Sequence, residues 1–481
     1  MDKIIIGVCS EAHLFVTSTN EGIERELVEH FKFPVPNAKF MPSFKRGHWD
    51  GNIRLYNKDT KLIYRGLLPR ILKFAKDSGY SIDIDKDVHQ THNLTPEDFQ
   101  KFIDTLNLPF PPRDYQFAAA LKAINSKRQT ILSPTGSGKS LIIYLIARFL
   151  KQKTLIIVPT LTLVRQMAGD FEDYRCVDEI HQIYGGKDKK FDCKIAVTTW
   201  QSIFRMPRSF FAEFGCIIVD EVHGAKSKSL MGILEKASEI PYRYGTTGTL
   251  DGSDTHQWTI EGLLGPIHKV VTTSKLIEDE VLADFNIDCL LMRWPSKISE
   301  IVSQYTYQEE IDFLVTNETR NKMITNLVLS KPGNNLVLFN FIEKHGDVLY
   351  EMFKKATDRP IYYVVGKVDA DVRDEYRSMI EKESDAIVLA SIKAFATGTN
   401  IKKLDNIFFC HPSKSRIVTL QAIGRVLRRS EDKTKATLFD IVDDLSCGSA
   451  KNYSLRHYLE RLKIYKSEGF PFTVKKFGYK K

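Results

Sequence analysis

Short apolar segments rich in isoleucine and valine alternate with longer helix-favouring stretches from about residue 131 onward. The clearest are Thr154–Val158, Lys194–Val197, Cys216–Val219, Leu336–Phe339, Ile361–Val364, Ala386–Leu389 and Asn406–Cys410. Strands buried on both faces consist of nearly continuous apolar residues, and parallel strands need a crossover connection that is usually a helix. The alternation therefore predicts an α/β fold with parallel sheets covered by helices.

A polar, helix-favouring stretch interrupts the alternation between Thr272 and Pro332, with Glu278–Glu280 and Glu309–Asn326 as its clearest parts. We interpret it as the boundary between two α/β domains. The length of 481 residues agrees, because single hydrophobic cores stop growing at about 250–300 residues.

The chain before Asn93 has a different pattern. We expect helices at Gly22–Phe33 and Leu68–Ser78 and strands at Ile4–Val8 and Asn52–Tyr56. The fold class expected is α/β, with two parallel-sheet domains in tandem after a small N-terminal α+β domain. The domain boundaries expected are 1–92, 93–275 and 276–450, with a basic-aromatic tail at 451–481.

Charge and cysteine usage restrict the setting. The net charge of +9 is compatible with a polyanionic partner such as nucleic acid. The seven cysteines form no CxxC pair, so we expect neither a zinc cluster nor a disulfide framework, and a reducing, cytoplasmic compartment. The strongest apolar run, Leu141–Leu150, is broken by Arg148 and is shorter than the about 20 residues that a bilayer requires, so no membrane partner is expected.

The segment Ser133–Ser140 carries the strongest chemical signal, because it follows the apolar Thr130–Leu132 and precedes a helix-favouring run. In such a loop, backbone N–H groups wrap a triphosphate, Lys139 reaches the β- and γ-phosphates, and the Ser140 hydroxyl binds Mg²⁺. The first position is Ser133 rather than the glycine of the general P-loop pattern. The nucleotide-binding residues predicted here are Thr135, Gly136, Ser137, Gly138, Lys139 and Ser140.

Two adjacent carboxylates follow the apolar strand Cys216–Val219. Asp220 and Glu221 would stand at its carboxyl end, where ligands bind in open α/β sheets. Together with the upstream P-loop, this predicts that Asp220 holds Mg²⁺ and that Glu221 orients or deprotonates the attacking water.

The basic segment Gln421–Arg429 lies in the second α/β domain. On a helix, Gln421, Arg425 and Arg428 would share one face. Two interpretations are open: a solvated or phosphate-binding basic face, or an arginine finger that stabilises charge on the transferring γ-phosphate. We favour the finger, because its distance in sequence from Lys139 would make hydrolysis depend on domain closure.

Together these segments resemble motifs I, II and VI of superfamily 2 helicases, with Asp220–His223 as a DEVH box. The resemblance implies two RecA-like domains, ATP and Mg²⁺ as cofactors, and catalytic roles for Lys139, Asp220, Glu221, Gln421, Arg425 and Arg428. Arg113 and Gln116 resemble the adenine-recognising Q-type motif, and Asp114 could also serve as a helix N-cap.

The remaining motifs follow in the order typical of that superfamily. They are Val158–Thr160 with Gln166, Thr198–Ser202, Thr247–Thr249, Val337–Phe339, and Ala390–Ser391 with Thr397–Asn400. The resemblance implies that some of these residues track nucleic-acid phosphates, and that the Thr247–Thr249 turn couples the γ-phosphate to the strand site. The predicted contacts are Thr160, Thr199, Trp200, Gln201, Ser391 and Thr397.

Along its whole length the chain is similar to the UvsW-type helicases of T-even bacteriophages, including the segment Phe44–Gly51. That similarity implies a DNA-dependent ATPase that remodels branched DNA and R-loops in recombination, replication and repair. Duplex and branched DNA, RNA–DNA hybrids, and recombination or single-strand-binding proteins are the partners it suggests.

The N-terminal residues themselves interleave cations with aromatic rings, which suits phosphate contacts and base stacking. Lys45, Arg46, Arg54 and Lys58 are the predicted DNA contacts. Trp49 is expected in the core rather than on DNA. The tail from Lys463 has two open alternatives: contact with nucleic acid, or packing against the second domain.

The function predicted is an ATP-dependent DNA helicase or translocase. An RNA helicase is the alternative among enzymes, because the core motifs contact backbone rather than base or sugar. A strand-annealing or scaffold protein is the alternative outside enzymes, and the intact ATPase residues argue against it as the sole role.

Overall fold

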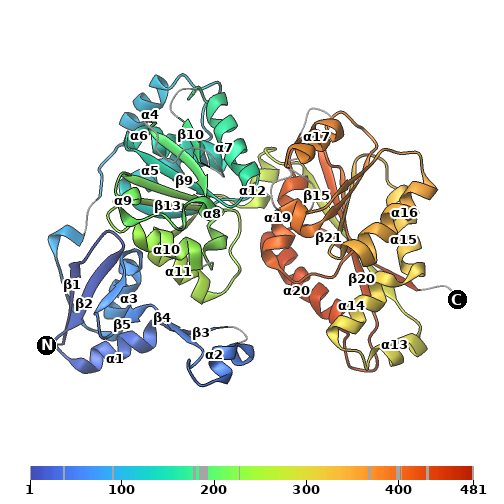
Figure 1. The fold of residues 1–481 in the computed structure, drawn as a ribbon, viewed down its shortest axis with the longest axis horizontal. Coiled ribbons are helices and arrows are strands. Elements are labelled where there is room, and N and C mark those ends of the chain that lie inside the picture. Colours follow the sequence, from blue (N-terminus) through green and yellow to red (C-terminus); the bar gives the residue numbers. More distant parts are fainter. Residues whose placement is uncertain are drawn as a thin grey trace. The chain divides into compact units, whose positions relative to one another are not determined.

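The computed structural model describes residues 2–35, 38–88, 91–176, 180–183, 193–226, 228–366, 370–396, 401, 403–429 and 433–478. They form two compact units (Figure 1). The first comprises residues 1–133 and 138–270, and the second comprises residues 134–137 and 271–481.

The first unit contains a parallel sheet of seven strands in the order β10-β11-β9-β12-β13-β8-β14. Its strands are β8 (Arg128–Leu132), β9 (Thr154–Val158), β10 (Ile180–Ile183), β11 (Ile195–Thr199), β12 (Cys216–Asp220), β13 (Tyr242–Thr247) and β14 (Ile267–Lys269). Its helices are α4 (Pro96–Thr105), α5 (Asp114–Ser126), α6 (Lys139–Leu150), α7 (Leu161–Asp173), α8 (Trp200–Ile203), α9 (Arg208–Phe211), α10 (Lys228–Lys236) and α11 (Asp254–Leu264).

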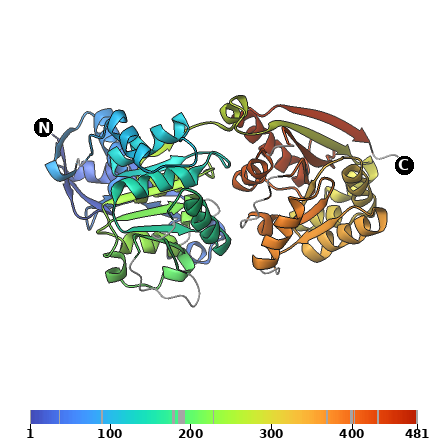
Figure 2. The same ribbon diagram turned by 90° about the horizontal axis from the view of Figure 1, so that it is seen from above.

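Both faces of this sheet are covered, as the apolar strand sequences predict. Successive residues of β9 alternate between two cores: Ile156 packs with α5, α6 and α7, and Leu155 and Ile157 pack with α8 to α11. The helical layers on the two sides of the strands are visible in Figure 2. The central strands β9, β11 and β12 are therefore fully buried, and their side chains are accessible for chemistry only where the strands end.

The N-terminal part of the first unit is a separate small sheet of order β5-β6-β2-β1-β7 with its own core. Its elements are β1 (Lys3–Val8), β2 (His13–Ser18), α1 (Glu21–His30), β5 (Tyr56–Asn57), β6 (Leu62–Tyr64), α3 (Leu68–Ser78) and β7 (Ser81–Ile84). A two-stranded ribbon projects from it and consists of β3 (Lys32–Pro34), α2 (Pro42–Lys45) and β4 (Asn52–Arg54) (Figure 1).

The second unit repeats the parallel arrangement, in the order β17-β18-β16-β19-β20-β15-β21. Its strands are β15 (Asp284–Arg293), β16 (Asn335–Phe339), β17 (Ile361–Val364), β18 (Ile387–Ser391), β19 (Asn406–Phe409), β20 (Lys435–Asp444) and β21 (Phe472–Gly478). Its helices are α12 (Thr273–Glu278), α13 (Ser296–Val302), α14 (Tyr307–Thr316), α15 (Glu318–Leu329), α16 (Asp347–Ala356), α17 (Ala370–Ile380), α18 (Ile392–Ala396), α19 (Arg416–Val426) and α20 (Tyr453–Glu468). The fold class predicted from the sequence is confirmed.

Several local expectations were wrong. The helix expected through Phe33 ends at His30, and the strand expected at Asn52–Tyr56 is divided between β4 and β5. The interruption at 272–332 contains the ten-residue strand β15, which pairs with β20 and β21. Residues 472–478 pair with β15 as β21, so this part of the tail follows the packing alternative.

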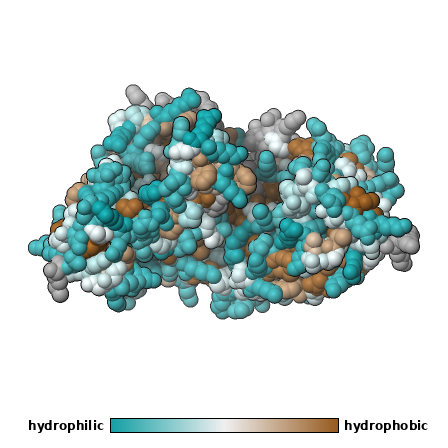
Figure 3. All heavy atoms as spheres, turned by 90° about the horizontal axis from the view of Figure 1, so that it is seen from below, coloured by the Kyte–Doolittle hydropathy of each residue, from teal (hydrophilic) through white to brown (hydrophobic). Residues whose placement is uncertain are grey.

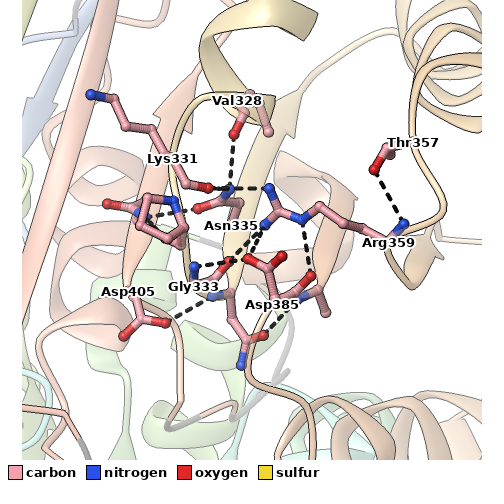
Figure 4. Close-up of polar contacts among 12 residues, drawn as sticks. Val328, Lys331, Gly333, Asn335, Thr357, Arg359, Asp385 and Asp405 are labelled. Atoms are coloured by element: carbon pink, nitrogen blue, oxygen red, sulfur yellow. Dashed lines mark hydrogen bonds and ion pairs between the residues drawn. The ribbon is translucent and has the colours of Figure 1, made fainter.

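Arg359 fixes the amino ends of three strands in the second sheet (Figure 4). Its guanidinium donates to the carbonyl oxygens of Lys331 at 3.1 Å, Gly333 at 2.8 Å and Asp385 at 3.0 Å, and forms an ion pair with the Asp385 carboxylate at 2.9 Å. Asn335 donates to the Lys331 carbonyl at 2.8 Å. Because these residues lie at the end of the sheet opposite Ser391, we assign them a structural role.

Candidate functional site

The carboxyl ends of β8, β12 and β13 bring three predicted motifs to one edge of the first sheet. Leu132 is in register with Thr247, and Asp220 is in register with Thr246. The Ser133 N–H donates to the Thr247 carbonyl at 3.0 Å. The P-loop, the paired acids and the Thr247–Thr249 turn therefore meet there.

Two glycines shape the loop before α6. Gly136 and Gly138 have φ values of +87° and +75°, which glycine adopts at no steric cost. A Cβ at Gly138 would lie 2.4 Å from Nε2 of Gln116, so a side chain there would also collide. The first N–H groups of a helix lack intrahelical partners, and α6 begins at Lys139, so this cradle fits the phosphates of a nucleotide.

Lys139 lies next to the predicted catalytic acid. Its Nζ is 3.7 Å from Oε1 of Glu221 and donates to the Ser133 carbonyl at 3.5 Å. Both contacts are long for hydrogen bonds, and an ammonium group has three donors. Lys139 can therefore turn to a phosphate without breaking a strong interaction.

Asp220 is buried at the end of β12. Its Oδ1 accepts hydrogen bonds from the Glu221 N–H at 2.9 Å and from the Thr246 hydroxyl. Burial, followed by the charge of Glu221, raises the pKa of Asp220. A divalent cation favours an ionised carboxylate, so the donor set of Asp220 and the Ser140 hydroxyl fits Mg²⁺. The Ser140 hydroxyl is 3.1 Å from the hydroxyl of Tyr174.

Glu221 occupies a backbone conformation that is rare for its residue type. Its φ is +51°, and such non-glycine residues concentrate at functional sites. Oε2 of Glu221 lies 3.1 Å from Nδ1 of His223, and the same Nδ1 lies 3.1 Å from the Thr247 hydroxyl oxygen. His223 therefore links the predicted catalytic acid to the Thr247–Thr249 turn.

The Q-type residues lie at the start of α5. Arg113 is the N-cap and Asp114 the first helical residue, so the expectation that Asp114 caps the helix was wrong. Gln116 replaces that cap, because its Oε1 accepts from the Arg113 N–H at 2.9 Å. Nε2 of Gln116 donates to the Gly138 carbonyl at 3.4 Å, which places the amide beside the P-loop.

The predicted phosphate-tracking residues of the first unit follow two adjacent strands. Val158 on β9 is in register with Thr199 on β11. The Thr160 hydroxyl accepts from the Leu163 N–H at 3.4 Å at the start of α7, and the Thr199 hydroxyl is 3.0 Å from that of Ser202. Trp200 and Gln201 open α8. These residues share the edge of the nucleotide site.

In the second unit, Ser391 ends β18 and its hydroxyl accepts from the Ala394 N–H at 3.3 Å, while Thr397 lies outside the described residues. Arg425 on α19 donates to the Phe395 carbonyl. Gln421 lies on the same helix. The expectation that Arg428 shares that helical face was wrong, because α19 ends at Val426 and Arg428 forms a β-bridge with Leu282.

The predicted DNA contacts of the N-terminal domain divide into two kinds. Arg54 pairs with Asp50 at 2.5 Å, and Lys58 pairs with Glu21 at 2.6 Å. Lys45 and Arg46 are exposed. Trp49 is half-buried and donates to the Asn52 carbonyl at 2.7 Å, so it lies at the end of the β3–β4 pair that is farther from the domain core, and not in the core expected for it.

Sequence reasoning missed Thr246 and Tyr174, which hold the side chains of Asp220 and Ser140. Thr246 could have been found, because it precedes the recognised Thr247–Thr249 turn by one residue. Tyr174 follows α7, and no sequence pattern links it to Ser140.

Comparison with known proteins agrees with this arrangement. Residues 10–85 match the family described as the N-terminal domain of the DNA helicase UvsW, residues 109–252 match the res subunit of type III restriction enzymes, and residues 319–430 match the helicase conserved C-terminal domain. The ATP-dependent DNA helicase uvsW of Enterobacteria phage T4 is 34% identical over 95% of this chain and 96% of its own length. The chain belongs to the UvsW family of ATP-dependent DNA helicases.

The fold of this UvsW-family helicase is also similar to that in the crystal structure of T4 UvsW. The TM-score is 0.53, with 31% identity over 99% of each chain. A second relative, the DNA 3'-5' translocase XPB2 of Sulfurisphaera tokodaii, is 33% identical over 70% of this chain and 84% of its own length. These relatives support membership of superfamily 2. Among the described residues, no helix is long and apolar enough to cross a membrane.

Proposed function

We propose that this helicase hydrolyses ATP with Mg²⁺ at the P-loop edge of the first sheet and uses the energy to unwind or branch-migrate DNA. Its proposed substrates are forks, four-way junctions, D-loops and R-loops in recombination, replication and repair. The observation that carries the proposal is the contact of Lys139, Glu221, His223 and Thr247 at one sheet edge. Thr199 ends β11 at that edge, and Thr160 is the N-cap residue of α7, two residues past the end of the neighbouring strand β9.

Each residue of the ATP site has a proposed role. Lys139 binds the β- and γ-phosphates, and Gln116 with Arg113 contacts the adenine side of the nucleotide. Ser140 and Asp220 would hold Mg²⁺, and the bound ion would supply positive charge that stabilises the phosphates. Glu221 takes the proton of the attacking water. Gln421, Arg425 and Arg428 act on the γ-phosphate, with an arginine as the finger.

His223 is proposed to couple ATP hydrolysis to movement along DNA. Loss of the γ-phosphate changes the position of Glu221, and His223 transmits that change to Thr247 because its Nδ1 contacts both side chains. Thr160, Thr199, Trp200 and Gln201 would hold the strand on the first unit, and Ser391 and Thr397 would hold it on the second. Such contacts go to the backbone and need no base sequence.

The N-terminal domain is proposed to engage the branch, with Lys45 and Arg46 as the main phosphate contacts and Arg54 and Lys58 as weaker ones. Recombination and single-strand-binding proteins are proposed as further partners, and the cytoplasm of the host as the location.

A substrate panel tests the proposal. ATPase and strand displacement are measured on single strands, linear duplexes, forks, four-way junctions and R-loops, with RNA of the same sequences beside DNA. We expect DNA to stimulate ATPase, and branched DNA to be displaced faster than linear duplex. Stimulation by RNA alone would support an RNA helicase, and strand annealing without any need for hydrolysis would support the scaffold alternative.

A further inference from the structure

The ribbon of the N-terminal domain exposes an unusual concentration of large apolar side chains. Phe40, Met41, Phe44 and Ile53, which we call the apolar tip, have exposed fractions of 63%, 40%, 39% and 38%. Single exposed apolar residues are normal on protein surfaces, whereas clusters mark binding sites. The face of the molecule in Figure 3 is mostly hydrophilic, with apolar residues in separate patches. The tip is therefore a candidate binding surface.

Cations flank the apolar tip. Lys39, Lys45 and Arg46 are exposed, and Nζ of Lys39 lies 5.2 Å from the centre of the Phe40 ring. Within the described part of the chain, no carboxylate forms an ion pair with these three residues. Aromatic rings between unpaired cations fit a ligand that presents flat apolar faces between phosphates, as nucleic acid does. An apolar protein surface would not need the cations.

The tip has a defined local structure. The Val35 N–H donates to the Gly51 carbonyl at 2.8 Å, and the Lys45 N–H to the Met41 carbonyl at 3.0 Å. The indole of Trp49 donates to the Asn52 carbonyl, where the segment that carries α2 returns to β4. These bonds order the backbone that carries Phe44.

The ribbon is braced against the motor part of the same unit. Phe33 of β3 packs edge-on against Trp258 of α11 with ring centres 4.7 Å apart, and the Arg70 guanidinium lies 4.0 Å above the same indole. Arg70 also pairs with Glu261 on α11. Because Ile260 and other residues of α11 belong to the core of the first parallel sheet, the ribbon is joined to the element that follows Thr247–Thr249.

Two further contacts make this joint stiff. A Cβ at Gly66 would lie 1.9 Å from the Glu261 carbonyl oxygen, so the two backbones touch and no other residue fits. Oε2 of Glu11 lies 3.0 Å from Arg65 Nη1 and 2.7 Å from Arg128 Nη2 at the start of β8. These contacts join the N-terminal domain to the first parallel sheet within one compact unit.

We propose that the apolar tip stacks on the terminal base pair of a duplex where its strands part, and acts as a fixed wedge against which the motor pulls the DNA. The proposal rests on the proposed function, because it needs a motor that moves nucleic acid. Inserted apolar side chains unstack base steps in other complexes, and a wedge can split a duplex only if it is rigid relative to the motor. The flanking Lys45 and Arg46 would hold the phosphates of the duplex end.

The test uses full-length protein and a forked DNA with 2-aminopurine either at the terminal pair or five pairs inside the duplex. Without ATP, wild type should change the fluorescence at the terminal pair and not inside. Phe40→Ala with Phe44→Ala should abolish this change and slow fork unwinding by about tenfold or more, since each ring contributes about 1–3 kcal/mol of stacking. ATPase stimulated by single strands should change less than twofold.

Three variants control the test. Phe15→Ala removes a ring that is 43% exposed in the same domain, and it should change neither fluorescence nor unwinding. The variant Phe40→Trp with Phe44→Trp keeps aromatic rings at both positions, so it should show the fluorescence change and the unwinding rate of wild type. Trp258→Ala should keep the fluorescence change but slow unwinding, because the tip still binds while its brace is lost.

Two results would overturn the wedge. One is unwinding by the Phe40→Ala, Phe44→Ala protein at the wild-type rate, and the other is a parallel loss of its ATPase on single strands. If the Phe40→Ala, Phe44→Ala protein still unwinds forks but no longer binds a protein partner or a second copy of itself, the tip is the binding site for that partner instead. If wild type itself neither hydrolyses ATP with DNA nor unwinds a fork, the proposed function fails, which is a separate outcome.

Discussion

Nδ1 of His223 lies 3.1 Å from the hydroxyl oxygen of Thr247. The same nitrogen is 3.1 Å from Oε2 of Glu221, so one imidazole contacts the acid of the ATP site and the turn after β13. Through α11, that turn continues to the brace of the N-terminal ribbon. A covalent and hydrogen-bonded route therefore connects Glu221 to the N-terminal ribbon, which is proposed to contact DNA.

Removal of either partner of this contact should uncouple hydrolysis from movement. We expect His223→Ala and Thr247→Val each to retain at least half of the DNA-stimulated ATPase while fork unwinding falls about tenfold. Because both act on one contact, the double variant should lose little more than either single one. If the loss of unwinding in the double variant equals the product of the losses in the two single variants, the two side chains act independently.

Glu221→Gln should bind nucleotide and hydrolyse it about 10²–10⁴ times more slowly, because the amide keeps the shape but accepts no proton. Single-turnover hydrolysis and binding of a fluorescent ATP analogue measure the two effects separately. Loss of nucleotide binding as well would make Glu221 a metal ligand or a structural residue.

Several of the buried strands were predictable from the sequence, but β13 and β20 were not identified although most of their residues are buried. Strands covered on both faces consist of apolar runs, so Thr154–Val158 and Ile361–Val364 were identified at their full length. β15 was missed because its polar residues Asn286 and Asp288 alternate with apolar ones, and its partner β20 lies far downstream.

Contacts between distant residues were not predictable. The helix that contains Gln421 was expected to continue to Arg428, but it ends at Val426, and Arg428 instead forms a bridge with Leu282, which is far away in the sequence. The ion pair of Lys58 also required the fold, because its partner Glu21 lies 37 residues away, whereas Asp50, the partner of Arg54, is a near neighbour in the sequence.

Those ion pairs predict unequal contributions to DNA binding. Lys45→Gln with Arg46→Gln should flatten the salt dependence of duplex binding by about 0.9 in log–log slope per lost phosphate contact. Arg54→Gln with Lys58→Gln is the matched control and should flatten it less, since Asp50 and Glu21 already balance these cations. Fluorescence anisotropy between 50 and 300 mM salt, roughly the range where such slopes are measured, distinguishes the pairs. Equal slopes for both variants would contradict this account.

His411 should make the protein sensitive to acid. Burial, followed by the nearby Arg320 and Arg461 charges, lowers the pKa of His411 to about 3 in the folded chain, against an unfolded value of about 6.5. Only the unfolded chain binds a proton between these values, so stability is unaffected above pH 6.5 and falls as pH drops toward 3. Within this range, each unit by which the pH falls should lower the free energy of unfolding by about 1.4 kcal/mol.

The variant His411→Asn isolates this effect. Its denaturation midpoint should fall less than that of wild type between pH 7.5 and 5.5, roughly one unit on either side of the free histidine pKa. An identical pH dependence in the two proteins would show that His411 is protonated or accessible in the folded state.

The most direct test of the ATP site is the effect of Lys139→Ala on a forked DNA, with phosphate release and strand separation followed in the same reaction. Both should fall by at least about 100-fold, because the variant removes the charge that stabilises the transferring phosphoryl group. Binding of the fork without nucleotide should stay within about twofold, since Lys139 lies beside the Ser133 carbonyl and Glu221 and the exposed cations proposed to bind DNA are untouched. Near-normal phosphate release by Lys139→Ala, or fork unwinding that survives its loss, would contradict the assignment of this sheet edge as the motor's ATP site.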